Sequence, residues 1–204
     1  MASTVPHEII LAPFEVWLAI VGSAFTDLDD VPSSPWVRLG TSGSKSMAVG
    51  GVTVQHPRTQ SMIRTYGSTG PVKSTITDED LLIGFTLIDL KLEEYTRIIN
   101  NGTVTQTAAG SGTAGIKDID LLCGLDPTQR AIDVRASVSP EGVGSGAWKM
   151  AYQVPKVVAT GSPSVAYTKT DGAGLTFEFQ AIEDLTASAG EEFGKLIVQN
   201  ADAT

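Results

Sequence analysis

The chain has 204 residues, which is the length of one domain or two small ones and is enough to enclose a hydrophobic core. Hydrophobic residues make up 42% of it, which excludes a largely disordered protein, and the formal net charge is −9. This negative field disfavours tight binding to nucleic acid phosphates or to anionic membranes, but it permits a protein that a polyanion passes without being held.

The single cysteine leaves the compartment undetermined, and the N-terminal sequence bears on secretion. Cys123 is the only cysteine, so the chain has no internal disulfide and is compatible with a reducing cytoplasm. The first 25 residues lack a basic segment and a clear small-residue cleavage site. No run approaches the roughly 18 apolar residues that span a bilayer. We therefore expect a soluble protein that is not secreted.

The first quarter of the chain predicts an arm, two strands and a loop. Residues 1–13 hold two prolines and no hydrophobic period, which is typical of an arm. Residues 14–25 predict a strand that is apolar on both faces, so one face needs cover from a helix or a partner subunit. After polar residues 26–35, a short strand is expected at 36–39. Residues 40–51 combine four glycines with several serines and predict a long loop or loose hairpin, which often serves recognition.

The next strands lead into the clearest element of the chain. Two strand pieces are expected at 52–55 and 61–66, joined through His56-Pro57, and another at 72–77. Residues 81–88 then predict the strongest strand, since they are apolar on both faces.

A helix is predicted at about 91–100. Asp89 is the candidate N-terminal cap, and residues 100–102 suit the C-terminus. One apolar stripe should pack the helix onto its own domain, and it consists of Leu92, Tyr95, Ile98 and Ile99.

After the helix, three segments alternate cleanly between apolar and polar residues: 132–138, 148–154 and 175–181. In the first of them, Asp133 and Arg135 lie opposite the apolar face. A further strand is expected within 193–198, and residues 199–204 form a loose tail. The sequence therefore predicts one mainly β domain at 14–198, an antiparallel sandwich or barrel-like fold with a single flanking helix and long loops.

The sequence contains few motifs typical of catalytic or binding sites, and their context does not support such a site. Residues 110–115 match G-x-G-x-x-G, but the preceding residues are polar and no alternating strands and helices surround them, so we expect a hairpin loop. The acidic clusters at 27–30 and 78–80 could offer oxygen ligands to calcium, yet neither has the spacing of a calcium loop. His7 and His56 are not placed as a base or a zinc ligand.

The cysteine and the tryptophans are expected to be buried rather than to carry chemistry. Cys123 lies in an apolar run and is expected to be a small core residue. The three tryptophans are expected to be core or interface anchors: Trp17, Trp36 and Trp148. No G-x-S-x-G nucleophile pattern occurs. We therefore expect no enzymatic activity, no cofactor and no metal.

Five segments carry a resemblance to a known family. They are WVRLG at 36–40, GGVTV at 50–54, GFTLIDLKLEEY at 84–95, FEFQAIED at 177–184 and EFGKL at 192–196. In these segments, which lie within residues 14–198, the chain resembles the major tail tube protein of long-tailed bacteriophages, particularly those with flexible, non-contractile tails. The chain has Lys91 where relatives often have a serine or threonine cap.

The resemblance implies a β-sandwich whose subunits close into hexameric rings that stack into a hollow tube. Inner strands would form a continuous barrel through which genomic DNA passes without specific binding. The implied partners are further copies of the chain, the tape measure protein and the tail terminator. The implied location is the virion tail, after assembly in the host bacterial cytoplasm.

Under this reading, the arm at 1–13 and the loop at 41–51 are the expected inter-ring contacts. The loop's candidates are Thr41, Ser42, Gly43, Ser44, Lys45, Ser46, Met47, Gly50 and Gly51. Asp133 and Arg135 are candidates for the lumen. Two rivals remain: another phage module, such as a decoration or tail-terminator protein, and a carbohydrate-binding β-sandwich or hydrolase.

Overall fold

A computed structural model describes residues 14–89, 91–99, 103–121, 123–124, 126–136, 149–161, 163–166 and 172–199. The predicted arm at 1–13, Trp148, the helix C-terminus at 100–102 and residues 200–204 lie outside them. The described part is mainly β with antiparallel sheets and one α-helix, α1 (Leu92–Ile99), which confirms the predicted fold class. No helix among these residues is long and apolar enough to cross a membrane.

One large antiparallel sheet forms the body of the molecule, in the order β2-β1-β9-β10-β12-β6-β3, with β11 paired to β12 and β13 paired to β10. Its strands are β1 (Phe14–Ile20), β2 (Val37–Arg38), β3 (Met47–Gln55), β6 (Leu82–Leu87), β9 (Arg130–Ala136), β10 (Met150–Thr160), β11 (Val165–Ala166), β12 (Gly174–Ala181) and β13 (Lys195–Val198).

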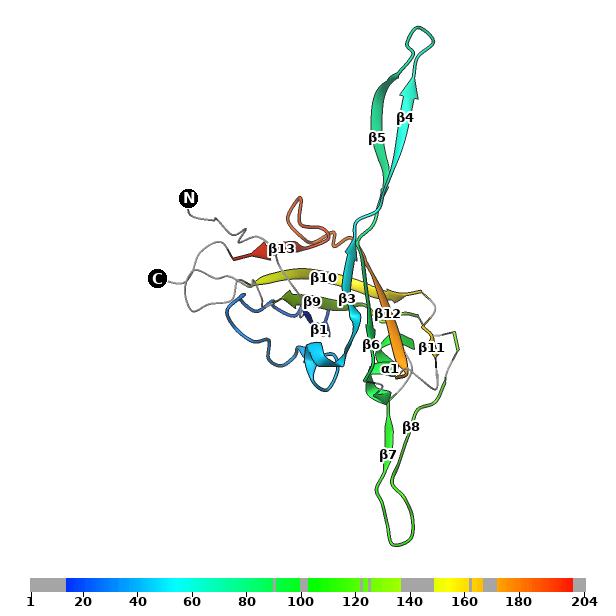
Figure 1. Ribbon diagram of the computed structural model, residues 1–204. Coiled ribbons are helices and arrows are strands. Elements are labelled where there is room, and N and C mark those ends of the chain that lie inside the picture. Colours follow the sequence, from blue (N-terminus) through cyan, green and yellow to red (C-terminus); the bar gives the residue numbers. More distant parts are fainter. Residues whose placement is uncertain are drawn as a thin grey trace, which may run out of the picture.

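Strand β10 bends this sheet back on itself. Its first residues, 150–153, pair with β9 on one side and β13 on the other, whereas residues 157–160 pair with β12. The register shifts between Val154 and Val157, around Pro155, which has no N–H for a ladder. In Figure 1, β9 and β10 run across the view while β12, β6 and β3 run steeply, so the two halves enclose a core.

That main core is built from the inward residues of both halves. Phe85, Phe177 and Phe179 lie at its centre, with the rings of Phe85 and Phe177 stacked at a centroid distance of 4.9 Å. The alternation predicted at 175–181 is observed, since Leu175, Phe177, Phe179 and Ala181 are all buried. Burial of such aromatic and aliphatic side chains is the main term that stabilises this fold.

A segment that we call the strap, residues 21–36, covers the other face of β1 and β9. Trp17, Ala19 and Ala131 form a second small core there with Trp36, and Phe25 packs against it. The indole N–H of Trp36 donates to the carbonyl of Ala24 at 2.8 Å. The predicted strand at 14–25 therefore ends at Ile20, and its second apolar face is covered by its own following loop rather than by a helix or a partner.

The helix α1 packs two of its four predicted contact residues against the main core. Ile98 is buried in that core and Tyr95 packs against it, while Leu92 and Ile99 are half-buried. Asp89 is not the cap that the sequence suggested, because its carboxylate accepts hydrogen bonds from Thr41 N and Ser46 Oγ. The carbonyl of Lys91 accepts the first helical bond, from the amide of Tyr95.

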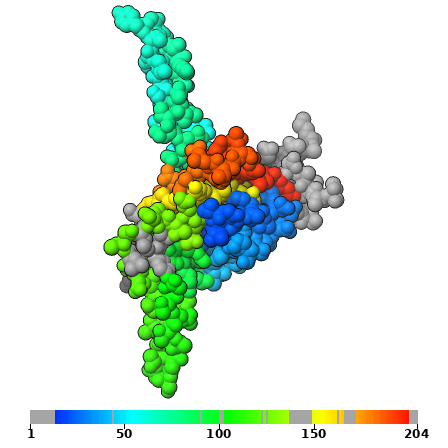
Figure 2. All heavy atoms as spheres, turned by 180° about the vertical axis from the view of Figure 1, so that it is seen from behind, coloured from blue at the N-terminus to red at the C-terminus, as the bar shows by residue number. Residues whose placement is uncertain are grey.

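Two hairpins leave the body in opposite directions (Figures 1 and 2). We call the first the ribbon: β4 (Arg58–Arg64), β5 (Pro71–Glu79) and the residues between them, which continue from β3 and into β6. The second consists of β7 (Thr105–Thr107) and β8 (Ile116–Asp118). It contains the G-x-G-x-x-G segment, where Gly110 pairs with Thr113 in the hairpin end, as expected of a plain hairpin loop.

Candidate assembly surfaces

The ribbon is exposed to solvent along almost its whole length. Every residue of β4 is exposed, and so is every residue of β5 except Glu79. Apolar side chains on it face solvent, namely Met62, Ile63, Tyr66, Val72 and Ile76. The strands would extend roughly 25 Å at about 3.3 Å per residue. A two-stranded hairpin of this kind is marginally stable alone, and its edges offer unpaired N–H and C=O groups.

Polar side chains join the two strands at the base of the ribbon, and a ring contact links this base to the body. Glu79 Oε1 accepts from Arg58 Nε at 2.9 Å and lies 2.9 Å from His56 Nε2. The ring of His56 also meets Phe193 edge-on, with centroids 6.2 Å apart. His56, Val54 and Phe193 line a groove of about 340 Å³ between the end of β3 and β13. His56 therefore contacts both the ribbon and the body at the point where the two meet.

A second candidate surface is the outward face of β3, β6 and β12, which we call the polar face. Cross-strand register places Thr53 beside Gly84 and Thr86 beside Thr176, and the two hydroxyls of Thr86 and Thr176 lie 3.3 Å apart. These three strands contain no lysine or arginine, and Glu178 is their only charged residue. The polar face therefore consists largely of small and hydroxyl-bearing residues. It has no cation that could neutralise a phosphate.

The segment at 40–51, predicted as a long loop or loose hairpin with inter-ring contacts at 41–51, has regular structure over much of its length. Residues 43–46 form a 3-10 helix, η1 (Gly43–Ser46), and Met47 begins strand β3. Gly43, Ser46 and Met47 are buried, so the expectation that they form inter-ring contacts is wrong. The packing is tight, since a Cβ added at Gly43 would lie 2.5 Å from Glu15 Oε1.

The other candidates of this segment lie closer to solvent. Thr41, Ser42 and Lys45 are exposed, and Gly50 and Gly51 lie on β3 with open space where a side chain would be. The side chain of Ser44 lies outside the described residues. This segment keeps its backbone in place through Asp89 and Ser46, whose side-chain oxygens accept from the amides of Thr41 and Ser42.

The lumen candidates on β9, Asp133 and Arg135, lie beneath the strap. Asp133 has no exposed surface, because the strap lies over it, so it does not face an open channel. Arg135 Nε donates to Asp133 Oδ2 at 2.8 Å, and its remaining N–H groups donate to the carbonyls of Thr26, Asp27 and Asp30. Burial raises the pKa of the Asp133 carboxyl, and the hydrogen bond from Arg135 offsets only part of that shift.

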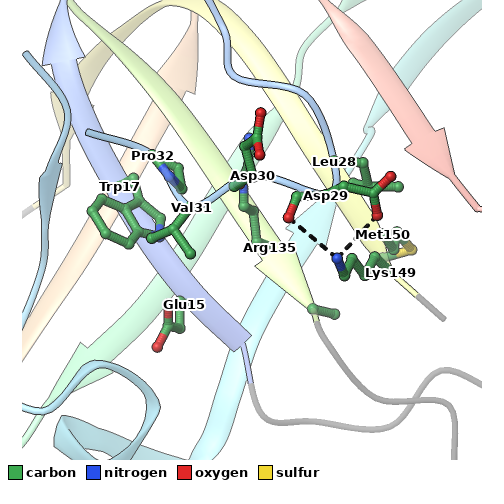
Figure 3. A pocket seen from close by; sticks show the side chains of 11 residues that line it. Glu15, Trp17, Leu28, Asp29, Asp30, Val31, Pro32, Arg135, Lys149 and Met150 are labelled. Carbon is green, nitrogen blue, oxygen red and sulfur yellow. Dashed lines mark hydrogen bonds and ion pairs between the residues drawn. The ribbon is translucent and has the colours of Figure 1, made fainter. Parts of the chain in front are cut away.

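The strap also forms one wall of a small pocket over β1, β9 and β10 (Figure 3). Trp17, Val31, Arg135 and Met150 are among its lining residues, and Lys149 reaches the Asp29 carboxylate at 3.0 Å. Its volume is about 140 Å³. Sites for drug-sized ligands are roughly 300 to 1,000 Å³, so this pocket is too small for one.

The acidic clusters and the cysteine show no arrangement for metal binding in the described residues. In the described residues no group of three His, Cys, Asp or Glu side chains is arranged to hold a metal ion. Asp29 pairs with Lys149, Glu79 pairs with Arg58, and Asp80 accepts from Gln180 Nε2. Cys123 is exposed, so its predicted place in the core is wrong.

Sequence reasoning missed both the ribbon as a free arm and the polar face. Each strand piece was visible, but nothing local showed that residues 58–79 would pair only with each other. A usable signal was the acid-free run at 59–77 in a chain rich in acids. No protein-family model matches the chain, and no curated protein matches its sequence.

Proposed function

We propose that this protein is a structural, self-assembling subunit, the major tail tube protein of a long-tailed bacteriophage with a non-contractile tail. Hexameric rings of the chain stack into a hollow tube that delivers DNA to the host, with the tape measure protein and tail terminator as further partners. Assembly takes place in the host cytoplasm and the product resides in the virion. No step requires catalysis, a cofactor or a metal.

The observation that carries this proposal is the ribbon. Folding of two strands with both faces in water leaves little buried apolar area to offset the entropy of ordering them. Contact with another molecule would supply that burial and satisfy the open strand edges. A second hairpin points the opposite way, and this polarity suits head-to-tail stacking (Figure 1).

In this proposal, ring closure and the lumen use the end of the sheet formed by β12, β6 and β3. Strand β3 ends the sheet, so its outer edge can accept a strand from a neighbour. The polar face on β3, β6 and β12 then lines the channel, with Glu178 as its charged group. A channel wall without Lys or Arg leaves DNA phosphates unneutralised, and carboxylates within about 8 Å repel them in physiological salt. These two properties keep a polyanion mobile.

Negative-stain electron microscopy of the purified full chain tests the proposal. Hollow tubes or stacked rings at high protein concentration are the expected result. A strictly monomeric protein would contradict it, whereas single rings without stacking would favour the tail-terminator alternative. Retention on polysaccharide resins by a monomer would favour the carbohydrate-binding alternative.

A further inference from the structure

We propose that the ribbon tip of one copy docks onto the strap of the next copy, so that the chain carries two complementary surfaces for stacking. This inference rests on the proposed self-assembly and names the surfaces that make it. The first surface comprises the ribbon residues 59–77. The second comprises the strap, residues 21–36, with its exposed neighbours on β1 and β2.

The ribbon surface and the strap carry charges of opposite sign. Residues 59–77 contain Arg64 and Lys73 and no acid, although the whole chain has 23 acids against 14 bases. The guanidinium of Arg64 donates to the carbonyl of Thr69, so neither cation is paired with a carboxylate in the part of the chain that is described. The ribbon tip is therefore positively charged.

The strap carries the matching negative charge. It contains Asp27, Asp29 and Asp30 and no Lys or Arg, and all three are exposed. Lys149 neutralises Asp29. Asp27 and Asp30 use their main-chain carbonyls to hold Arg135, which leaves both carboxylates pointing at solvent without a described cation partner. The strap thus offers two carboxylates and the ribbon two cations that have no described ion-pair partner.

Both surfaces also expose apolar side chains that water disfavours. The ribbon presents Met62, Ile63, Tyr66 and Val72, and the strap with its flanks presents Ile20, Val21, Val31 and Val37. Apolar contact supplies most of the free energy of association, while the charges select partner and orientation. Like-charged pairings, strap on strap or ribbon on ribbon, are disfavoured by repulsion.

The placement of the two surfaces prevents a copy from closing on itself. The ribbon leaves one side of the body, and the strap lies on the side away from the ribbon tip (Figures 1 and 2). A contact between different patches on successive copies is heterologous, and it builds rings or filaments instead of ending at a dimer. Stacked rings need this kind of contact.

Charge reversal tests the pairing. The ribbon variant is Arg64→Glu with Lys73→Glu, and the strap variant is Asp27→Lys with Asp30→Lys; all four side chains are exposed, and the strap changes leave the carbonyls that hold Arg135 in place. Each variant alone should lose at least about tenfold of its sedimenting assembly, with an unchanged circular dichroism spectrum. An equimolar mixture should assemble again, since ribbon and strap charges are then opposite between alternating copies. Lys195→Glu, on β13, is the control for a charge change elsewhere and should assemble normally.

The possible results separate the docking proposal from the proposed function. Normal assembly of both single variants overturns the docking, while tubes of the unaltered chain would still support the proposed function. Failure of the mixture to assemble, when both variants are folded and the unaltered chain forms tubes, also overturns it. A monomeric unaltered chain overturns both proposals.

Discussion

The guanidinium of Arg135 lies 2.8 Å from a carboxylate that water does not reach, that of Asp133 two residues earlier on the same strand. The same guanidinium holds three carbonyl groups of the strap. One side chain therefore both neutralises a buried charge and fastens the covering segment of β1 and β9. Removing it leaves an unpaired buried charge, which is far more costly than losing a surface ion pair.

Arg135→Met should destabilise the fold by about 3 to 5 kcal/mol, because it leaves Asp133 buried and unpaired and removes the side chain that holds the strap. Urea unfolding followed by tryptophan fluorescence measures the change, and Trp36 should become more quenchable as the strap loosens. Arg58→Met is the matched control: its exposed pair with Glu79 should contribute at most about 1 kcal/mol. Equal losses in the two variants would refute the role given to Arg135.

Asp133→Asn should change how stability depends on pH. Burial raises the pKa of Asp133 in the folded chain above that in the unfolded chain. The folded state therefore binds this proton more tightly, and the contribution of Asp133 is most favourable below the unfolded pKa near 3.8 and is lost as pH rises through the folded pKa. The free energy of unfolding of the unaltered chain, relative to the Asn variant, should thus increase as pH falls through this range. A difference that falls with acidification would show the opposite shift.

Phe177→Ala should cost about 3 to 5 kcal/mol, since the ring is fully buried and stacked on Phe85. Its neighbour Thr176 is exposed on the polar face of the same strand, so Thr176→Ala should change the free energy of unfolding by less than about 0.5 kcal/mol. Thermal and urea unfolding of the two variants compare the two faces of β12 directly. Similar losses at both positions would mean that the outward face is also packed.

The rate of tryptic cleavage within the ribbon should report on assembly. In free subunits, trypsin should cleave after Arg64 and Lys73, which lie on the exposed ribbon. In assembled tubes both sites should be protected, because a partner covers them. Lys195 on β13 serves as the reference site within the same digests. Unchanged cleavage at Arg64 and Lys73 in tubes would place the ribbon away from any contact.

Basic substitutions on the polar face should turn a passive channel into one that holds DNA. Thr176→Lys and Glu178→Lys add cations to exposed positions of β12, so tubes should still form but should retain short duplex DNA in a salt-dependent way. Binding of fluorescent DNA to purified tubes measures this, and the same changes on free subunits show whether enclosure is needed. Lysine tubes that release DNA as readily as unaltered ones would place the polar face outside the lumen.

The sequence by itself determined which residues form the core strands and where the helix lies. Alternation at 175–181 predicted that Phe177 and Phe179 point inward, because the side-chain period of a strand is two wherever it is placed. The stripe with Ile98 likewise located the helix, because the helical period is also local. These features needed no knowledge of distant partners.

The tertiary structure alone decided what covers each strand and which faces remain open. The same alternation that set Asp133 opposite an apolar face could not show that the strap would bury it. Nor could it show that Asp89 would bond to Thr41 instead of capping the helix, or that residues 58–79 would stand free of the body. Burial of a polar face and exposure of an apolar one depend on contacts between residues far apart in the chain, and a local period carries no information about them.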